Sequence, residues 1–243
     1  MITCSVGGGD KFTETVVLWD SLASQWQLAP NEGAYVDRQQ GTSCANCGSN
    51  LRSIALADAI RSAVGTDLTL QAYVTQPEAS TLTVLEINEA GHLSPTLRQL
   101  PGHVLAAYPA VDIHALPYPS NTFDIVVHSD TLEHVTNAVH ALMECHRVLR
   151  ACGWLCFTVP TIIGRLSRSR SGLAKSFHGT PHTATDDFVV HTEFGSDMWT
   201  YVLHAGFSSV TVNTVDFPAA LALSARKSGP QCRSDAASWL WPQ

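Results

Sequence analysis

The sequence of 243 residues has no long hydrophobic run and little charge, with 14% of its residues charged. A membrane-spanning helix needs roughly 20 consecutive apolar residues, and no stretch approaches that length. The first residues also lack the basic start and apolar core of a secretory signal. We therefore expect a cytoplasmic protein that neither spans nor binds a membrane.

Positive charge is scarce as well, with 14 Lys and Arg residues against 21 Asp and Glu and a formal net charge of −7. Wide contact with nucleic-acid phosphates needs clustered cations, and the cationic cluster here is limited to Arg165, Arg168 and Arg170. This balance argues against a nucleic-acid partner. The hydrophobic content of 45% suffices for one sizeable core with a small appendage, and the oligomeric state stays open.

Seven cysteines without a secretion signal predict free thiols or metal ligands before disulfides. Cys44 and Cys47 have metal-ligand spacing, Gly48 relieves the turn after them, and Cys4 is the natural third ligand. These residues predict a zinc site whose shell a His, an Asp or water completes. The alternative is a metal-free knuckle held by packing. The remaining cysteines are expected in the core or, for the last, in a tail: Cys145, Cys152, Cys156 and Cys232.

Elements alternate along the segment from Leu82 to Pro160. Apolar runs predict strands over 82–87, 123–128 and 153–159, and helical spacing predicts helices over 93–100 and 135–150. This alternation is typical of an α/β, Rossmann-like fold with a mostly parallel sheet, whose ligands bind at the carboxyl ends of the strands.

Four motifs stand in order within this segment: Leu-Pro at 116–117, Phe-Asp at 123–124, Leu-Glu-His-Val at 132–135, and Arg-Val-Leu at 147–149 with Gly153. With them the chain resembles the class I S-adenosylmethionine-dependent methyltransferases, of the methyltransferase type 11 kind, over roughly residues 80–225. The resemblance implies a seven-stranded sheet with helices on both faces, and S-adenosylmethionine as the cofactor.

The resemblance also implies the cofactor-binding residues. The turn 86–92 replaces the usual glycine-rich turn and carries Glu89 and His92, and the second strand, near 103–108, ends without the usual acid for the ribose. Asp112 matches the family acid that accepts a hydrogen bond from the adenine amino group. The full cofactor set is Glu86, Asn88, Gly91, Asp112, Ile113, Ser129 and Asp130.

Related methyltransferases carry zinc-ribbon-like leaders with a second cysteine pair upstream, and Gly7 stands here in place of one of those cysteines. We expect a leader over 1–64, the methyltransferase domain over 65–225, and a tail over 226–243. Within the leader we expect a short helix from Trp19, a turn at 30–33 and a helix over 51–64. A long polar insertion, 161–195, is typical of an active-site lid.

Three residues are candidates for catalysis at the end of the 123–128 strand. His134 is the expected base or substrate-orienting group, with His128 and Glu133 beside it, because an imidazole can take a proton from an attacking nucleophile. The alternative is a histidine that caps a helix or bonds a backbone carbonyl.

The polar insertion favours a small, polar acceptor in small-molecule biosynthesis. The expected substrate residues are Arg52, Tyr118, Arg165, His178, His191 and Glu193. Methyl transfer by in-line displacement is the leading hypothesis. One alternative is cyclisation within S-adenosylmethionine that releases methylthioadenosine. Another is a non-catalytic relative that acts through a protein partner.

Overall fold

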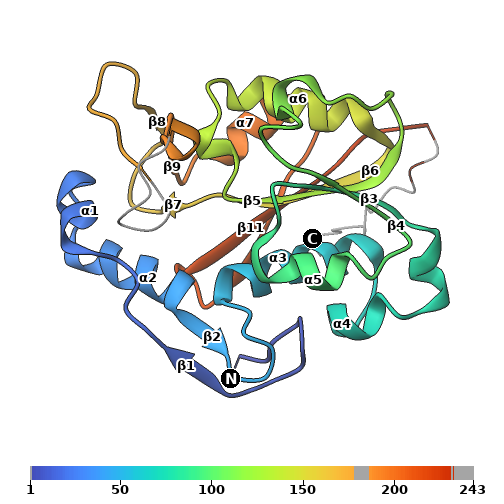
Figure 1. The fold of residues 1–243 in the computed structure, drawn as a ribbon, viewed down its shortest axis with the longest axis horizontal. Helices are drawn as coiled ribbons and strands as arrows, with labels where there is room; N and C mark the ends of the chain where they lie inside the picture. The colour runs from blue at the N-terminus through green and yellow to red at the C-terminus, as the bar shows by residue number, and fades with distance from the viewer. Residues whose placement is uncertain (1, 178–185, 231, 233–243) are drawn as a thin grey trace, which may run out of the picture.

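A computed structural model describes residues 2–177, 186–230 and 232 (Figure 1). Its centre is a six-stranded sheet in the order β10-β11-β6-β5-β3-β4, where we expected seven strands. Four strands are parallel, and β10 and β11 add an antiparallel hairpin at one edge. The expected α/β fold is confirmed. The strands are β3 (Thr83–Ile87), β4 (Gly102–Ala106), β5 (Phe123–Ser129), β6 (Leu149–Thr158), β10 (Thr211–Val215) and β11 (Ala220–Arg226).

Helices cover both faces of this sheet, as Figure 1 shows. Alternate residues of each strand point to opposite faces, so Val84 packs in one core and Leu85 in the other. One core lies under α3 (Leu51–Val64), with the short helices α4 (Leu70–Tyr73) and α5 (Ser94–Leu97) on the same side. The other lies under α6 (Ala138–Val148) and α7 (Trp199–His204).

Helix α3 has the predicted bounds because both of its ends carry local signals. The Asn50 side chain accepts a hydrogen bond from the Ser53 N–H, and Gly65 ends the helix with φ of 70°. Helix α6 is shorter than predicted. Asn137 caps its start by accepting from the His140 N–H, which leaves Val135 extended, and at the other end the chain passes directly into β6. The predicted helix over 93–100 is a 3-10 turn, Gly91–Leu93, followed by α5.

Within the leader, β1 (Phe12–Glu14) pairs with β2 (Thr42–Cys44) in a two-stranded sheet, and buried leader residues such as Tyr35 and Cys44 belong to the core under α3. The predicted first helix is α1 (Asp20–Gln25). The turn predicted at 30–33 is wrong, because α2 (Pro30–Gly41) begins there. Proline suits the first position of a helix, and the Glu32 side chain accepts a 2.8 Å hydrogen bond from the Ala29 N–H.

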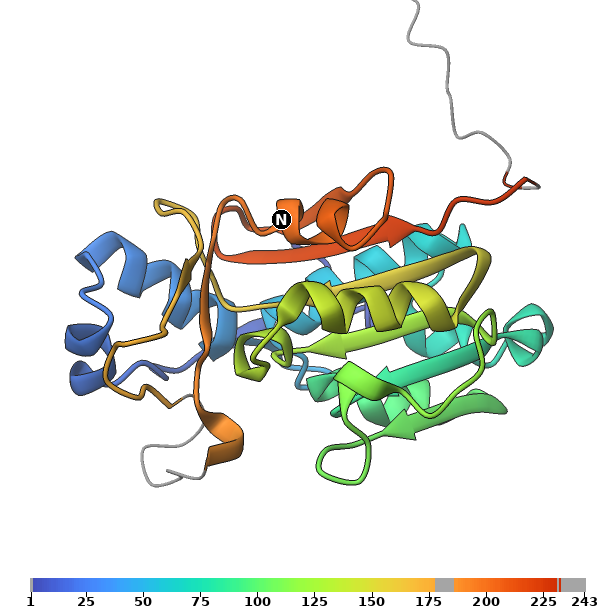
Figure 2. The ribbon, with the colours of Figure 1, turned by 90° about the horizontal axis from the view of Figure 1, so that it is seen from above.

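The described part of the 161–195 segment folds into a three-stranded sheet of β7 (Thr161–Ile162), β9 (Thr192–Gly195) and β8 (Arg168–Ser169). It also contains a 3-10 turn over Asp186–Phe188. Figure 2 shows the parallel strands pointing toward the side of the molecule where this segment and helices α1 and α2 lie. Helices α1 and α2 and the 161–195 segment therefore lie beyond the carboxyl ends of the strands.

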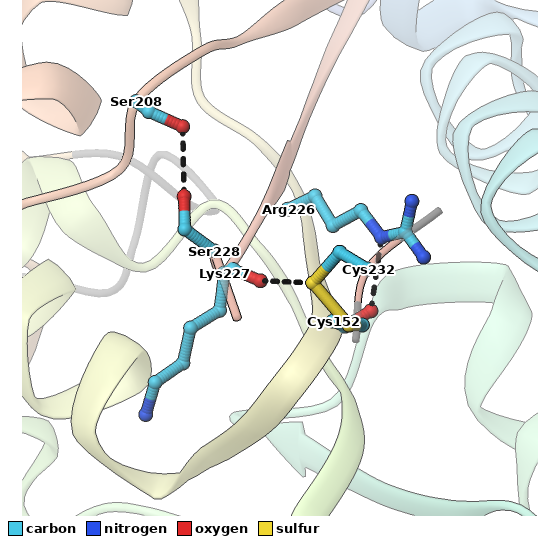
Figure 3. Close-up of a disulfide and its surroundings, with 6 residues drawn as sticks. All are labelled: Cys152, Ser208, Arg226, Lys227, Ser228 and Cys232. Atoms are coloured by element: carbon cyan, nitrogen blue, oxygen red, sulfur yellow. Dashed lines mark hydrogen bonds between the residues drawn. A yellow bond between two sulfur atoms is a disulfide. The ribbon is translucent and has the colours of Figure 1, made fainter. Parts of the chain in front are cut away.

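Cys152 is joined to Cys232 by a disulfide, which corrects the expectation that these cysteines are a core thiol and a tail thiol (Figure 3). The partners are 80 residues apart in the sequence, and Lys227, whose N–H donates to the Gly153 carbonyl, brings the end of the chain back beside Cys152. Most of the tail beyond 226 lies outside the described residues. No described helix combines the length and the apolar character needed to cross a membrane.

Candidate active site

The turn after β3 bends sharply although it has few glycines. Asn88, Glu89 and Gly91 all have positive φ, at 58°, 51° and 54°. Asn is one of the residues that tolerate this region, and the Asn88 side-chain oxygen accepts a 2.8 Å hydrogen bond from the Tyr108 N–H. Asn88 therefore fixes the turn against the residues that follow β4.

Glu86, at the end of β3, stabilises this turn through hydrogen bonds. Its side chain is fully buried, and Oε1 accepts a 2.6 Å hydrogen bond from the Ala90 N–H. Oε2 accepts from the Ser94 hydroxyl at 3.2 Å and lies 2.6 Å from His103 Nε2. Glu86 lines neither of the two cavities described below, so its predicted contact with the cofactor is replaced by a positioning role.

A first cavity, of about 600 Å³, opens at the carboxyl ends of β3, β4 and β5. Four predicted cofactor residues line it: Asn88, Asp112, Ile113 and Asp130. Gly91 and Ser129 lie outside the lining, because Gly91 shapes the turn and the Ser129 hydroxyl is bonded to that of Thr158 at 2.7 Å. The other lining residues include Glu89, Tyr108, His114, Thr131, His134, Val135, Asp187, Phe188 and His191.

The carboxylate of Asp112 is a hydrogen-bond acceptor in the wall of this cavity. The His114 backbone N–H, 2.9 Å from Oδ1, is the main cause that lowers the Asp112 pKa, and the His114 ring adds to it. The side chain is 55% exposed, so the carboxylate can also receive a donor from a ligand. Its contact with the adenine amino group stays a prediction.

Glu89, which the sequence analysis named only as part of the turn that replaces the usual glycine-rich turn, lines the same cavity. Its carboxylate is 61% exposed and is ion-paired with Arg98. The stretch after β4 supplies no acid, as expected, and Tyr108 lines the cavity there instead. The missed signal was the positive φ of Glu89, which a single sequence does not reveal.

A second cavity, of about 510 Å³, lies between the carboxyl end of β5 and the leader. Asp130, His134 and Phe188 line both cavities, so the two spaces meet there. Sequence reasoning missed most of its wall, because those residues come from the leader. The lining includes Val17, Leu18, Trp19, Leu22, Trp26, Leu28, Val36, Gln39, Gln40, Asn50, Arg52, His92, Glu133, Thr161 and Ile162.

Arg52 reaches this junction from α3, as predicted, but it is held by protein groups. It forms an ion pair with Asp130 and donates a 2.6 Å hydrogen bond to the Gln40 side-chain oxygen. Asp130 has a positive φ of 49° at the end of β5, which turns its carboxylate toward Arg52. The pair thus fixes the wall between the two cavities.

His134 lies at the same junction, and the backbone beside it fixes its ring. Nδ1 is 3.1 Å from the Val189 carbonyl oxygen, which can only accept, so Nδ1 carries a proton. Nε2 lies 3.7 Å from Glu133 Oε1. A proton that arrives at Nε2 would therefore be stabilised by the buried Glu133 carboxylate. The carbonyl bond that we considered as the alternative is present, and it orients the ring toward the shared space.

His128 lies behind the site, and its predicted catalytic role is wrong. Its ring is fully buried and stacks on Phe157 with the ring centroids 4.8 Å apart. Burial lowers the His128 pKa to about 3, against a smaller opposing effect of Glu133. It lines neither cavity, so this neutral ring cannot exchange a proton with a substrate.

Three predicted substrate residues are engaged elsewhere. Tyr118 packs edge-on against Phe123, away from both cavities. Arg165 binds Glu32 of α2 and thereby fastens the 161–195 segment to the leader. Glu193 is buried and paired with two arginines, Arg168 and Arg170. His191 does line the first cavity, and its N–H donates to the Glu133 carbonyl, whereas His178 lies outside the described residues.

The three predicted metal ligands come together in the leader. The Sγ atoms of Cys4, Cys44 and Cys47 all lie within 4.8 Å of one another. Two similar turns present them: the Gly8 N–H donates to the Cys4 carbonyl at 2.7 Å, the Gly48 N–H donates to the Cys44 carbonyl at 2.8 Å, and both glycines have positive φ.

Their acidities differ. Burial raises the pKa of Cys4 to about 12. Burial also acts to raise the pKa of Cys47, but hydrogen bonds from Ser49 and the neighbouring thiols outweigh it and lower that pKa. A Cβ at Gly7 would lie 2.8 Å from the Cys47 Cβ, so this position has no room for a cysteine as the fourth ligand of a zinc ribbon. The cluster offers three sulfur ligands, and zinc stays a prediction.

In open α/β sheets, nucleotide-type cofactors commonly bind at the carboxyl ends of the strands, which is where the first cavity lies. Residues 45–157 match the family described as methyltransferase domain. A Mycolicibacterium smegmatis protein named “probable S-adenosylmethionine-dependent methyltransferase” is 36% identical over 81 residues, which are 31% of this chain and 31% of that protein. Over residues 45–157 the chain is therefore similar to S-adenosylmethionine-dependent methyltransferases, and it spans about a third of the length of the curated relative that it matches.

Solved structures are similar at lower identity. The CurJ carbon methyltransferase is 16% identical with a TM-score of 0.45, and the match covers 86% of this chain and 70% of that chain. An S-adenosylmethionine-dependent methyltransferase of Thermotoga maritima is 12% identical with a TM-score of 0.44, over 73% of this chain and 90% of that chain.

Proposed function

We propose that this protein transfers the methyl group of S-adenosylmethionine to a small-molecule acceptor. The observation that carries the proposal is the meeting of two cavities at Asp130 and His134. One cavity has the turn and the acid that suit the cofactor, and the other is free for an acceptor. In-line displacement requires this arrangement, because nucleophile, methyl carbon and sulfur must lie on one line.

In the first cavity Asp112 receives the adenine amino group, and the backbone of the Asn88–Gly91 turn lies against the rest of the cofactor. Glu89 supports ribose binding in place of the missing acid, since its exposed carboxylate is a hydrogen-bond acceptor on the same wall. The bound cofactor supplies an activated methyl group. The chain's own task is therefore to align the two reactants and to exclude water.

His134 acts as the base in this proposal. Its protonated Nδ1 leaves Nε2 to receive a proton, and Glu133 stabilises the resulting cation. Arg52 and Arg165 were expected to bind a polar acceptor. Both form ion pairs with protein carboxylates instead, so they do not support an anionic acceptor.

We also propose that Cys4, Cys44 and Cys47 hold zinc, with water as a fourth ligand. Tetrahedral zinc with thiolate ligands is a common structural site, and three thiols gathered by two glycine-containing turns fit it. The metal would join residues 4–9 to the turn after β2. Its contribution is to the fold of the leader, because the cysteines line neither cavity.

Two variants test the roles in the proposed reaction. Asp112→Ala should weaken S-adenosylhomocysteine binding about tenfold through loss of a hydrogen bond to a charged acceptor. His134→Ala should leave that affinity within about twofold while slowing turnover once an acceptor is available. Asp67→Ala, at an exposed acid outside both cavities, is the matched control. Equal losses of affinity in the Asp112 and His134 variants would show that these roles are misassigned.

A further inference from the structure

We infer that the cavity beside the leader binds an acceptor built on an aromatic ring that carries a hydroxyl group. The inference rests on the proposed methyl transfer, because it names the acceptor of the same site. Residues 17–36 of the leader give this cavity an apolar wall, which consists of Val17, Leu18, Trp19, Leu22, Trp26, Leu28 and Val36. The later leader residues Gln39, Gln40, Asn50 and Arg52 add polar groups to the lining.

Three aromatic side chains line this cavity. Trp26 is 5% exposed, and its ring N–H already donates a 2.7 Å hydrogen bond to the Ser176 hydroxyl. The indole therefore offers apolar surface to an occupant. Trp19 and Phe188 add two more rings to the lining. Rings pack well against rings, and covering apolar surface is the main gain in such pockets, so a flat apolar body fits better than a small polar molecule.

Charged groups gather at one end of the cavity. Arg52, Asp130, Glu133 and His134 lie at the junction with the cofactor cavity or beside it. An occupant with its ring against the leader would place a single polar substituent at this end. Arg52 is paired with Asp130, which disfavours an anionic substituent and leaves a hydroxyl as the best match.

The chemistry at the junction suits an aromatic hydroxyl. Its pKa of about 10, as in tyrosine, makes it acidic enough to give its proton to an imidazole as it attacks. The hydroxyl oxygen forms a bond to the methyl carbon while the methyl–sulfur bond breaks with its electron pair on sulfur. The sulfonium becomes a neutral thioether, and the hydroxyl proton passes to His134 Nε2. The products are a methyl ether and S-adenosylhomocysteine.

Size supports the same class. A cavity of about 510 Å³ lies within the range of roughly 300–1,000 Å³ found for sites that bind drug-sized molecules. One or two fused rings would fill much of it, whereas a two-carbon alcohol or amine would leave most of the wall in contact with water.

The test is isothermal titration of the protein saturated with S-adenosylhomocysteine, with 2-naphthol and ethanolamine as the two probes. We expect 2-naphthol to bind at least about tenfold more tightly than ethanolamine, since only its rings cover the apolar wall. Trp19→Ala should weaken 2-naphthol about tenfold. Trp199→Ala, at a tryptophan that is 41% exposed on α7 and outside both cavities, should leave it unchanged. Leu22→Ala provides a second, smaller truncation of the wall if Trp19→Ala does not fold.

Equal binding of the two probes would overturn the inference, and so would an unchanged 2-naphthol affinity in both wall variants. Loss of S-adenosylhomocysteine binding in the unmodified protein contradicts the proposed methyl transfer. Normal S-adenosylhomocysteine binding without 2-naphthol binding contradicts only the acceptor class.

Discussion

Glu86→Gln tests whether a residue that touches neither cavity nevertheless controls cofactor binding. The substitution keeps the shape of the side chain and replaces one carboxylate oxygen with an NH₂ group. Both oxygens of Glu86 accept hydrogen bonds, one from the Ala90 N–H and the other from Ser94. An NH₂ group cannot accept either bond, so at least one donor loses its partner in a fully buried place.

The magnitude follows from these contacts. A hydrogen bond to a charged group contributes about 1.5–3 kcal/mol, and His103 or the Ser94 hydroxyl can recover part of it by accepting from the new NH₂ group. We therefore expect the free energy of unfolding to fall by about 2 kcal/mol. The turn from Asn88 to Gly91 also loses part of its anchor, so S-adenosylhomocysteine affinity should fall about tenfold, or about 1.4 kcal/mol.

Urea unfolding followed by circular dichroism measures the first effect, and isothermal titration measures the second. Ser94→Ala is the matched control, because it removes one donor to Glu86, leaves the Ala90 hydrogen bond in place and should cost about 1.5 kcal/mol. An unchanged urea midpoint together with an unchanged cofactor affinity for Glu86→Gln would refute the positioning role.

Two further variants test the buried histidine and the cysteine cluster. The His128 pKa of about 3 in the folded state lies below the usual 6.5, so the unfolded chain binds the extra proton and stability falls as the pH drops below 6.5. Between pH 7.5 and pH 5.0 this group should cost about 2 kcal/mol, and urea unfolding of His128→Phe should lack that loss. Cys47→Ser should abolish stoichiometric zinc, measured by mass spectrometry, and lower the leader's resistance to proteolysis, whereas Cys145→Ser should retain the metal. Zinc retained by Cys47→Ser would contradict the proposed ligand set.

Much of the fold could be predicted because its signals are local. The bounds of α3 follow from the cap at Asn50 and the left-handed Gly65, and the β5–α6–β6 order follows from motifs within one segment. Cys44 and Cys47 could be grouped because of their two-residue gap, with Cys4 as the natural third ligand, and the structure brings the three together. In the same way Asp112, Asp130 and His134 were found because each follows a predicted strand or motif.

The errors concern partners that lie far apart in the sequence. Arg165 pairs with Glu32, 133 residues away, and nothing near either residue indicates that choice. Glu193 was expected at a substrate, but two nearby arginines neutralise it in a buried place. The apolar wall of the second cavity could not be predicted either, since it depends on how the leader packs over the strand ends. Cys152 and Cys232 were predicted to be free thiols because disulfides are rare in chains without a secretion signal. Their proximity in the fold, 80 residues apart in the sequence, was not visible from the sequence.

The most direct test of the central claim is isothermal titration of the unmodified protein with S-adenosylmethionine and with S-adenosylhomocysteine. The account predicts that both bind at one site per chain with micromolar dissociation constants. It predicts in addition that Asp67→Ala, which lies outside the cavities, binds both as tightly. Absence of binding at millimolar ligand would contradict the claim that the cavity at the carboxyl ends of β3, β4 and β5 is a cofactor site.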